Sequence, residues 1–102
     1  MLMNNKIENR ILCAAIYYDD GIKRAQLPRN IKSGIVACGL RHGNCFTVLT
    51  TMFPDRDYIN KTKQGFLTSD GDFVDRKEGS KIAFEAKQIK KDDGCLFSED
   101  LY

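Results

Sequence analysis

The sequence predicts one α+β domain, built from a small, mostly antiparallel sheet and two packed helices. A length of 102 residues allows a single small domain. The apolar run ILCAAIYY at residues 11–18 predicts a buried strand. Residues 64–89 combine turn, strand and helix signals, and so predict a hairpin that leads into a helix. We expect residues 1–10 to form a flexible arm and residues 11–102 to form the domain.

Composition narrows the class of protein. The hydrophobic fraction of 42% and the charged fraction of 29% are ordinary for a globular chain. A net charge of +2 does not favour binding to duplex nucleic acid, which needs a clustered basic surface. No apolar run approaches the length of a membrane span, and residues 1–10 lack an apolar signal core. The sequence therefore predicts a cytoplasmic protein without a membrane partner.

The first half of the chain predicts two strands and a helix. Ile11–Tyr18 is unbroken by polar residues, which favours a central strand covered on both faces. Residues 22–33 show no periodicity and are expected to form a loop or an irregular insertion. A short strand is predicted at residues 35–38. A helix is then predicted over residues 45–53, ended by Pro54.

The second half begins with the hairpin. Asp70-Gly71 is a typical two-residue loop with positive backbone angles, and the flanking apolar pairs place the hairpin at residues 66–74. Asp75 and Glu78 have the spacing of a capping box, which predicts a helix over residues 76–89.

Apolar positions in the second half predict packing. Ile82, Ala83, Ala86 and Ile89 recur at helical spacing and are expected to face the sheet. The C-terminal tail is expected to pack as well, because four of its side chains are apolar or aromatic: Leu96, Phe97, Leu101 and Tyr102. An uncovered Leu101 and Tyr102 in so small a domain also favour a dimer.

Basic residues lie at both helix entrances. The start of a helix carries a partial positive charge, so cations there are unfavourable and anions are favoured. Arg41 and His42 precede the first predicted helix, and Arg76 and Lys77 begin the second. One interpretation is that these are solvated surface cations, neutralised by nearby acids. The other is an anion site, in which free amides and cations converge on a phosphate.

The cysteines have two other interpretations besides the one we favour. Cys13, Cys38, Cys45 and Cys95 form no C-x-x-C pair and lie in apolar surroundings, so we expect reduced, buried, metal-free thiols. A zinc site formed by Cys38, His42, Cys45 and Cys95 is an alternative, although its spacings match no familiar zinc module. Cys45 activated by His42 would be a catalytic thiol, but no third orienting group accompanies the pair. We therefore expect neither an enzyme nor a cofactor.

Five short motifs are spread over most of the chain. They are Ala14-Ala15-Ile16, Gly39-Leu40-Arg41-His42, Gly65-Phe66 through Arg76, Gln88-Ile89 and Ser98-Glu99-Asp100-Leu101-Tyr102. Together these motifs resemble a family of small bacteriophage proteins. The chain is similar to the Thoeris anti-defence sponge proteins, which sequester cyclic ADP-ribose signals made by Toll/interleukin-receptor-type immune enzymes. The chain departs from the pattern at residues 22–33, which look like an insertion, and at Gly79 and Lys87.

The resemblance implies a protein that binds a cyclic nucleotide in the cytoplasm of the infected bacterium without turnover. It also implies a homodimer or larger assembly, with the nucleotide buried between protomers. Arg41 and Arg76 are the expected phosphate contacts, and Phe66 or a neighbouring tyrosine the expected stacking face. The alternative is a small inhibitor that docks on a host protein through its acidic, aromatic tail. The full set of predicted ligand-binding residues is Tyr18, Arg41, His42, Phe66, Arg76, Lys77 and Gln88.

Overall fold

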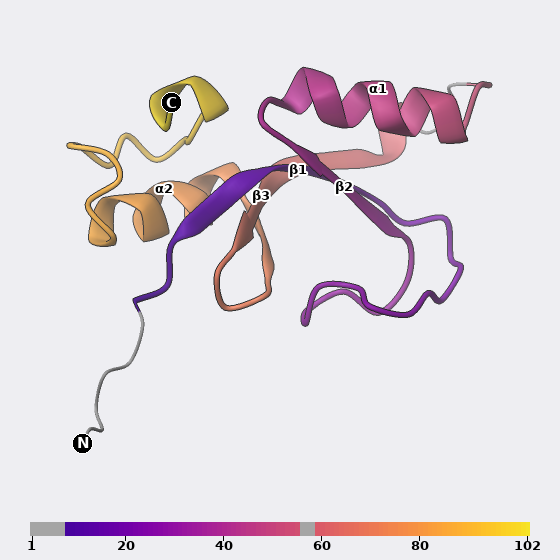
Figure 1. Ribbon diagram of the computed structural model, residues 1–102, viewed down its shortest axis with the longest axis horizontal. Coiled ribbons are helices and arrows are strands. Elements are labelled where there is room, and N and C mark those ends of the chain that lie inside the picture. Colours follow the sequence, from indigo (N-terminus) through magenta and orange to yellow (C-terminus); the bar gives the residue numbers. More distant parts are fainter. Residues whose placement is uncertain (1–7, 56–58) are drawn as a thin grey trace.

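The computed structural model describes residues 8–55 and 59–102, and it confirms the α+β class (Figure 1). Four strands form one antiparallel sheet in the order β2-β1-β3-β4. Helix α1 packs on β1 and β2, and helix α2 packs on β3 and β4. The elements are β1 Ile11–Tyr18, β2 Ile35–Gly39, α1 His42–Met52, β3 Thr62–Thr68, β4 Phe73–Asp75 and α2 Arg76–Glu85, with short 3-10 turns at Ile59–Lys61 and Ser98–Asp100.

The predicted central strand is confirmed. β1 pairs with β2 on one side and with β3 on the other, in the bounds that its apolar run indicates. Ala14, Ala15 and Ile16 are completely buried, and both α1 and α2 contact β1. A β-bulge at Leu12 interrupts the pairing with β3, and this side chain stays exposed.

The core lies between the sheet and the two helices. Ile16 and Phe66 from the sheet, Leu49 from α1 and Ala83 from α2 belong to one buried cluster. Gly79 has a packing reason for its place in α2, because a Cβ atom there would stand 3.1 Å from the Phe66 ring. The glycine that departs from good helix propensity therefore lets α2 approach the sheet closely.

Helix α1 begins earlier than predicted. Its first residue is His42 rather than Cys45, and its last is Met52. Asn44 explains the early start, since its side-chain oxygen accepts a hydrogen bond of 2.8 Å from the Arg41 backbone amide. The junction before the helix is therefore shorter than its turn-like composition indicates.

Helix α2 ends earlier than predicted, at Glu85 instead of Ile89. The Gln88 amide donates to the Ala83 carbonyl and the Lys87 amide donates to the Phe84 carbonyl, which is the Schellman pattern of a helix end. Lys87 takes the left-handed conformation that this motif requires, with φ of 61°. At the start of α2, one of the two hydrogen bonds of the predicted capping box is present: the Asp75 side chain accepts a hydrogen bond from the Glu78 amide.

The hairpin between β3 and β4 is confirmed, but its loop is not the predicted two-residue turn. β3 ends at Thr68 and β4 begins at Phe73, so residues 69–72 form the loop. Gly71 alone within it has a positive φ, of 94°. The Thr68 amide donates to the Asp72 carbonyl, and the Gly71 amide donates to the Thr68 carbonyl. This wider loop satisfies its own backbone groups without a positive φ at Asp70.

Residues 22–33 form the predicted loop, and it reaches from β2 to the opposite edge of the sheet. Arg29 makes two hydrogen bonds to the Asp72 carboxylate, of 3.0 and 2.7 Å. The Asn30 side-chain amide donates to the Phe73 carbonyl and its oxygen accepts from the Phe73 amide. Asn30 therefore occupies the outer edge of β4 much as a further strand would.

The described part of the predicted arm, residues 8–10, is bonded to the hairpin. The Arg10 amide donates to the Ser69 hydroxyl, and the Asn9 side chain accepts from the Asp70 amide. The rest of the arm, residues 1–7, lies outside the described residues.

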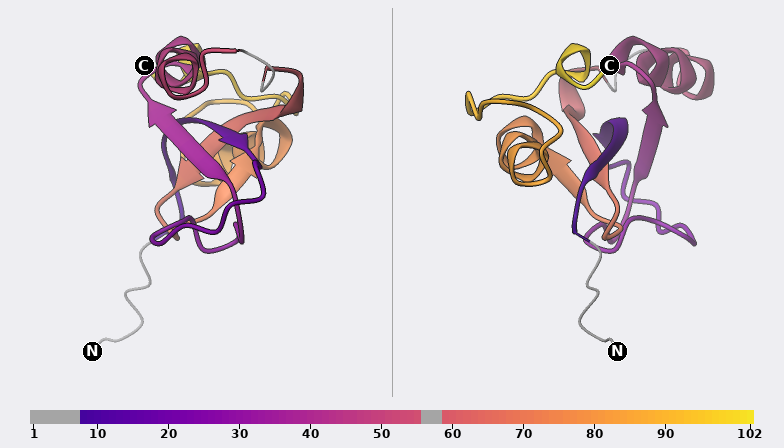
Figure 2. Two further views of the ribbon diagram at one scale, coloured as in Figure 1. Left: turned by 90° about the vertical axis from the view of Figure 1, so that its right-hand side faces the viewer. Right: turned by 60° about the vertical axis from the view of Figure 1, so that its left-hand side comes forward.

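The tail packs against the domain, as predicted (Figure 2). Leu96 and Ser98 are buried, and Leu101 packs against the core. Phe97 and Tyr102 remain about half exposed, at 49% and 47%. The tail is therefore covered by its own chain on one side and open on the other.

Candidate functional site

Three of the four basic residues predicted at the helix entrances, Arg41, His42 and Arg76, lie where the tail crosses the start of α1, the middle of β3 and the start of α2. His42, the first residue of α1, is buried at this junction. Its Nε2 donates to the Gly65 carbonyl over 2.8 Å, and its ring meets the Phe66 ring edge-on at 5.1 Å. The other ring nitrogen, Nδ1, lies 3.5 Å from an Arg76 guanidinium nitrogen. The His42 imidazole therefore links the start of α1 to β3 and to the start of α2.

Arg76 is held by the tail and by β3. Its Nη1 donates to the Leu96 carbonyl and its Nη2 donates to the Gln64 side-chain oxygen, both over 2.7 Å. The guanidinium also lies over the Phe97 ring, 4.7 Å from its centroid. The Leu96 amide in turn donates to the Arg76 carbonyl over 3.0 Å. Arg76 therefore holds the beginning of the tail from both its backbone and its side chain.

Arg41 holds the far end of the same tail. Its Nη2 donates to a main-chain oxygen of Tyr102, and its guanidinium lies 5.1 Å from the centroid of the Tyr102 ring. The second terminal nitrogen, Nη1, is different. Among the described residues it is buried and has no hydrogen-bond partner. A buried guanidinium nitrogen without an acceptor is costly, and such groups mark places where an acceptor belongs.

Burial sets the charge of His42. Removal from water lowers the pKa of the imidazole below its ordinary value of 6.5, and the Arg76 charge lowers it further, while the Gly65 carbonyl opposes the shift. The ring is therefore neutral near pH 7. With its proton on Nε2, Nδ1 is an acceptor directed at Arg76.

The structure gathers four of the seven predicted ligand-binding residues. Arg41, His42, Phe66 and Arg76 lie at this junction, although Phe66 is completely buried and belongs to the core rather than to an open stacking face. Tyr18 lies four residues along β1 from Ala14, the residue that pairs with Phe66, which is about 13 Å away at the rise of a strand.

The other two predicted residues lie outside this junction. Lys77 is exposed in the first turn of α2. Gln88 has both ends of its amide engaged with the Ile11 backbone, over 2.8 Å each, so it ties the end of α2 to the start of β1.

Three residues of the site were missed by the sequence reasoning. Gln64 accepts from Arg76, and the rings that cover the two guanidinium groups belong to Phe97 and Tyr102. The only signal for the last two was the apolar character of the tail, which predicts packing but not the surface on which the tail packs.

The thiols do not match the zinc or the nucleophile alternative. The expectation of four buried cysteines is wrong, because Cys38 and Cys95 are exposed and only Cys45 is fully buried. Within residues 8–55 and 59–102, no group of three or more His, Cys, Asp or Glu side chains is placed to hold a metal ion. Burial raises the pKa of Cys45 to about 11, so this thiol is protonated near neutral pH.

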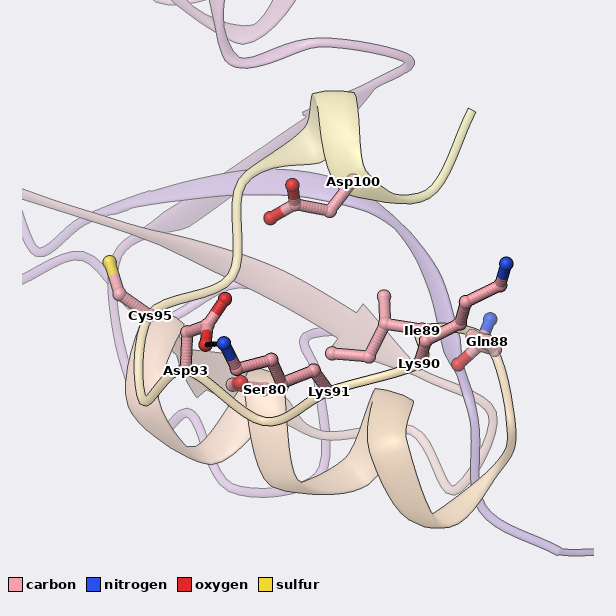
Figure 3. A pocket seen from close by; sticks show the side chains of 8 residues that line it. All are labelled: Ser80, Gln88, Ile89, Lys90, Lys91, Asp93, Cys95 and Asp100. Atoms are coloured by element: carbon pink, nitrogen blue, oxygen red, sulfur yellow. Dashed lines mark ion pairs between the residues drawn. The ribbon is translucent and has the colours of Figure 1, made fainter.

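A separate hollow of about 390 Å³ lies between α2, the segment that follows it and the tail (Figure 3). Lys91 and Asp93 form an exposed ion pair of 3.6 Å at one end, while Lys90 and Gln88 lie at the other. Its lining contains both positive and negative side chains, so we expect an anion to bind here less favourably than beside Arg41 and Arg76. The lining residues are Ser80, Gln88, Ile89, Lys90, Lys91, Asp93, Cys95 and Asp100.

Neither α1 nor α2, the helices of the described part of the chain, has the length and hydropathy of a membrane span.

Comparison with known proteins identifies the family. No curated protein and no solved structure gives a significant match. A family model described as phage T4 y16D protein matches residues 10–102, which is nearly the whole chain and includes both arginines of the junction. The chain therefore belongs to the phage T4 y16D protein family.

Proposed function

We propose that this phage protein binds and sequesters a cyclic nucleotide immune signal of the cyclic ADP-ribose type, and releases it uncleaved. The observation that carries the proposal is the buried, unpartnered Nη1 of Arg41 at the start of an eleven-residue helix. A helix start and a guanidinium with a free donor are what a phosphate group requires. The resemblance to the sponge proteins supplies the ligand class.

The tail makes contacts of the kind that a nucleotide would make. Main-chain oxygens of Leu96 and Tyr102 accept from the two arginines, as phosphate oxygens would. The rings of Phe97 and Tyr102 cover the guanidinium groups, as a purine would. A ligand that engages both arginines fully must therefore displace part of the tail, and its apparent affinity is lowered by the cost of that displacement.

Calorimetry with cyclic ADP-ribose isomers and cyclic oligoadenylates tests the proposal. A charge-assisted hydrogen bond is worth about 1.5–3 kcal/mol, so Arg41→Ala should weaken binding roughly ten- to a hundred-fold. Lys32→Ala is the control, because Lys32 is an exposed cation on the loop of residues 22–33. Heating the complex should release an intact ligand, as judged by mass spectrometry. Failure to bind any of these nucleotides, or release of a cleaved product, rejects the proposal.

Docking on a host protein is the second candidate. It is favoured by the open side of the tail, where Phe97 and Tyr102 are half exposed beside the acidic residues Glu99 and Asp100. Phe97→Ser should then abolish capture of a host protein that the unaltered chain retains, and the purified host protein should bind in isolation. Equal capture by both forms excludes the tail as the docking surface.

A further inference from the structure

The two edge strands of the sheet differ in whether their outward backbone groups are covered. β4, at one edge, is only three residues long, and the Asn30 side chain occupies its outer hydrogen-bonding groups at Phe73. Edge strands that are short or covered cannot recruit another strand. This edge is therefore closed within the chain itself.

β2, at the other edge, is longer, and among the strands of residues 8–55 and 59–102 it pairs with β1 only. It reads Ile-Val-Ala-Cys-Gly, with no charged residue, no proline and no bulge, the three devices that usually protect an edge. Alternate residues of an antiparallel strand direct their amide and carbonyl groups away from the strand they pair with. No strand of the described chain pairs with that side of β2, which lies at one side of the sheet in both views of Figure 2.

Exposed apolar side chains flank this edge. Leu40, which follows β2 directly, is 61% exposed. On α1, Asn44 lies against β2, because a Cβ atom added at Gly39 would meet the Asn44 Cβ at 2.8 Å. Val48 and Met52 continue the same stripe of the helix at four-residue spacing, and they are 43% and 47% exposed. An apolar stripe thus runs beside an open strand edge.

We propose that a second copy of this chain covers the edge, with β2 pairing antiparallel to the partner's β2 about a two-fold axis. Ala37 would lie opposite the partner's Ala37, and Val36 opposite the partner's Cys38. The two four-stranded sheets would join into one continuous sheet, and the α1 stripes would meet beside it.

Self-complementarity favours a second copy over a foreign strand. A two-fold axis brings each residue of β2 against a residue of the identical strand, so any charge in it would meet a like charge nearby. β2 has none. The residue on the axis, Ala37, is small and 5% exposed, so it allows close approach. The proposal concerns assembly alone and holds whether or not the protein binds a nucleotide.

Sedimentation and amide hydrogen exchange test the pairing, with reductant present because Cys38 is an exposed free thiol. Cys38→Lys places a charge on the pairing edge and should weaken dimerisation at least about tenfold. Cys95→Lys is the matched control, since Cys95 is also exposed and free but follows α2. The backbone amides of β2 should become protected as protein concentration rises, and lose that protection in Cys38→Lys only.

Two results would overturn the proposal. One is a protein that stays monomeric up to about 1 mM, where weak association is still detectable. The other is a dimer that Cys38→Lys leaves intact, with β2 amides that exchange equally fast at low and high concentration. Circular dichroism of both variants establishes that a lost dimer is not a lost fold.

Discussion

His42 makes stability depend on pH at the scale of a single residue. Its pKa is lowered by burial and by Arg76, so between the lowered value and 6.5 the unfolded chain binds more protons than the folded one. The contribution of the neutral ring is therefore complete above about pH 6.5 and is lost as the pH falls. Because His42 is the only histidine, no other imidazole titrates in this range.

Denaturant unfolding between pH 5 and pH 8 measures this effect. The free energy of unfolding should fall as the pH is lowered below about 6.5, and His42→Gln, which keeps a donor for the Gly65 carbonyl, should flatten the curve. Equal slopes in both proteins would assign the pH dependence to groups other than His42.

At the scale of one element, Lys87 determines how α2 ends. A residue other than glycine in the left-handed conformation costs about 1 kcal/mol, so Lys87→Gly should stabilise the protein by about that amount. Lys81→Gly, at an exposed position inside α2, should destabilise it by about 1 kcal/mol. Thermal unfolding of the pair distinguishes the two effects, and a loss of stability in both variants would contradict the Schellman end.

The tail is the second element with a testable anchor. Arg76→Ala removes two hydrogen bonds and the contact with the Phe97 ring, so it should lower stability by about 2 kcal/mol and speed amide exchange over residues 96–102. Lys77→Ala, the neighbouring exposed cation, should change neither measurement. If the tail keeps its protection in Arg76→Ala, its buried Leu96 and Ser98 are sufficient to hold it.

For the whole molecule, the core alone should maintain the fold without metal. Buried apolar residues from both helices, the sheet and the tail form one cluster. We expect a chelator to leave the melting temperature unchanged, and elemental analysis of the purified protein to find no stoichiometric zinc. A drop in melting temperature on chelation, restored by zinc, would revive the site predicted from Cys38, His42, Cys45 and Cys95.

The sequence by itself determined the elements whose signals are local. An unbroken apolar run places β1 at the centre of the sheet, a capping aspartate starts α2, and Gly71 locates the hairpin. Element ends were less well predicted. The start of α1 depends on one side-chain hydrogen bond from the Arg41 amide to Asn44, and the end of α2 depends on a left-handed conformation at Lys87 that its residue type does not favour.

Only the tertiary structure decided what the cations do. Arg41 and Arg76 are 35 positions apart in the chain, yet the tail passes over both and supplies one main-chain oxygen and one aromatic ring to each. Likewise, Asn30 binds the backbone of Phe73 in β4, which is 43 positions away in the chain. Such contacts cannot be predicted from local sequence. Each contact depends on where the sheet and the helices place the two residues, and not on their neighbours in the chain.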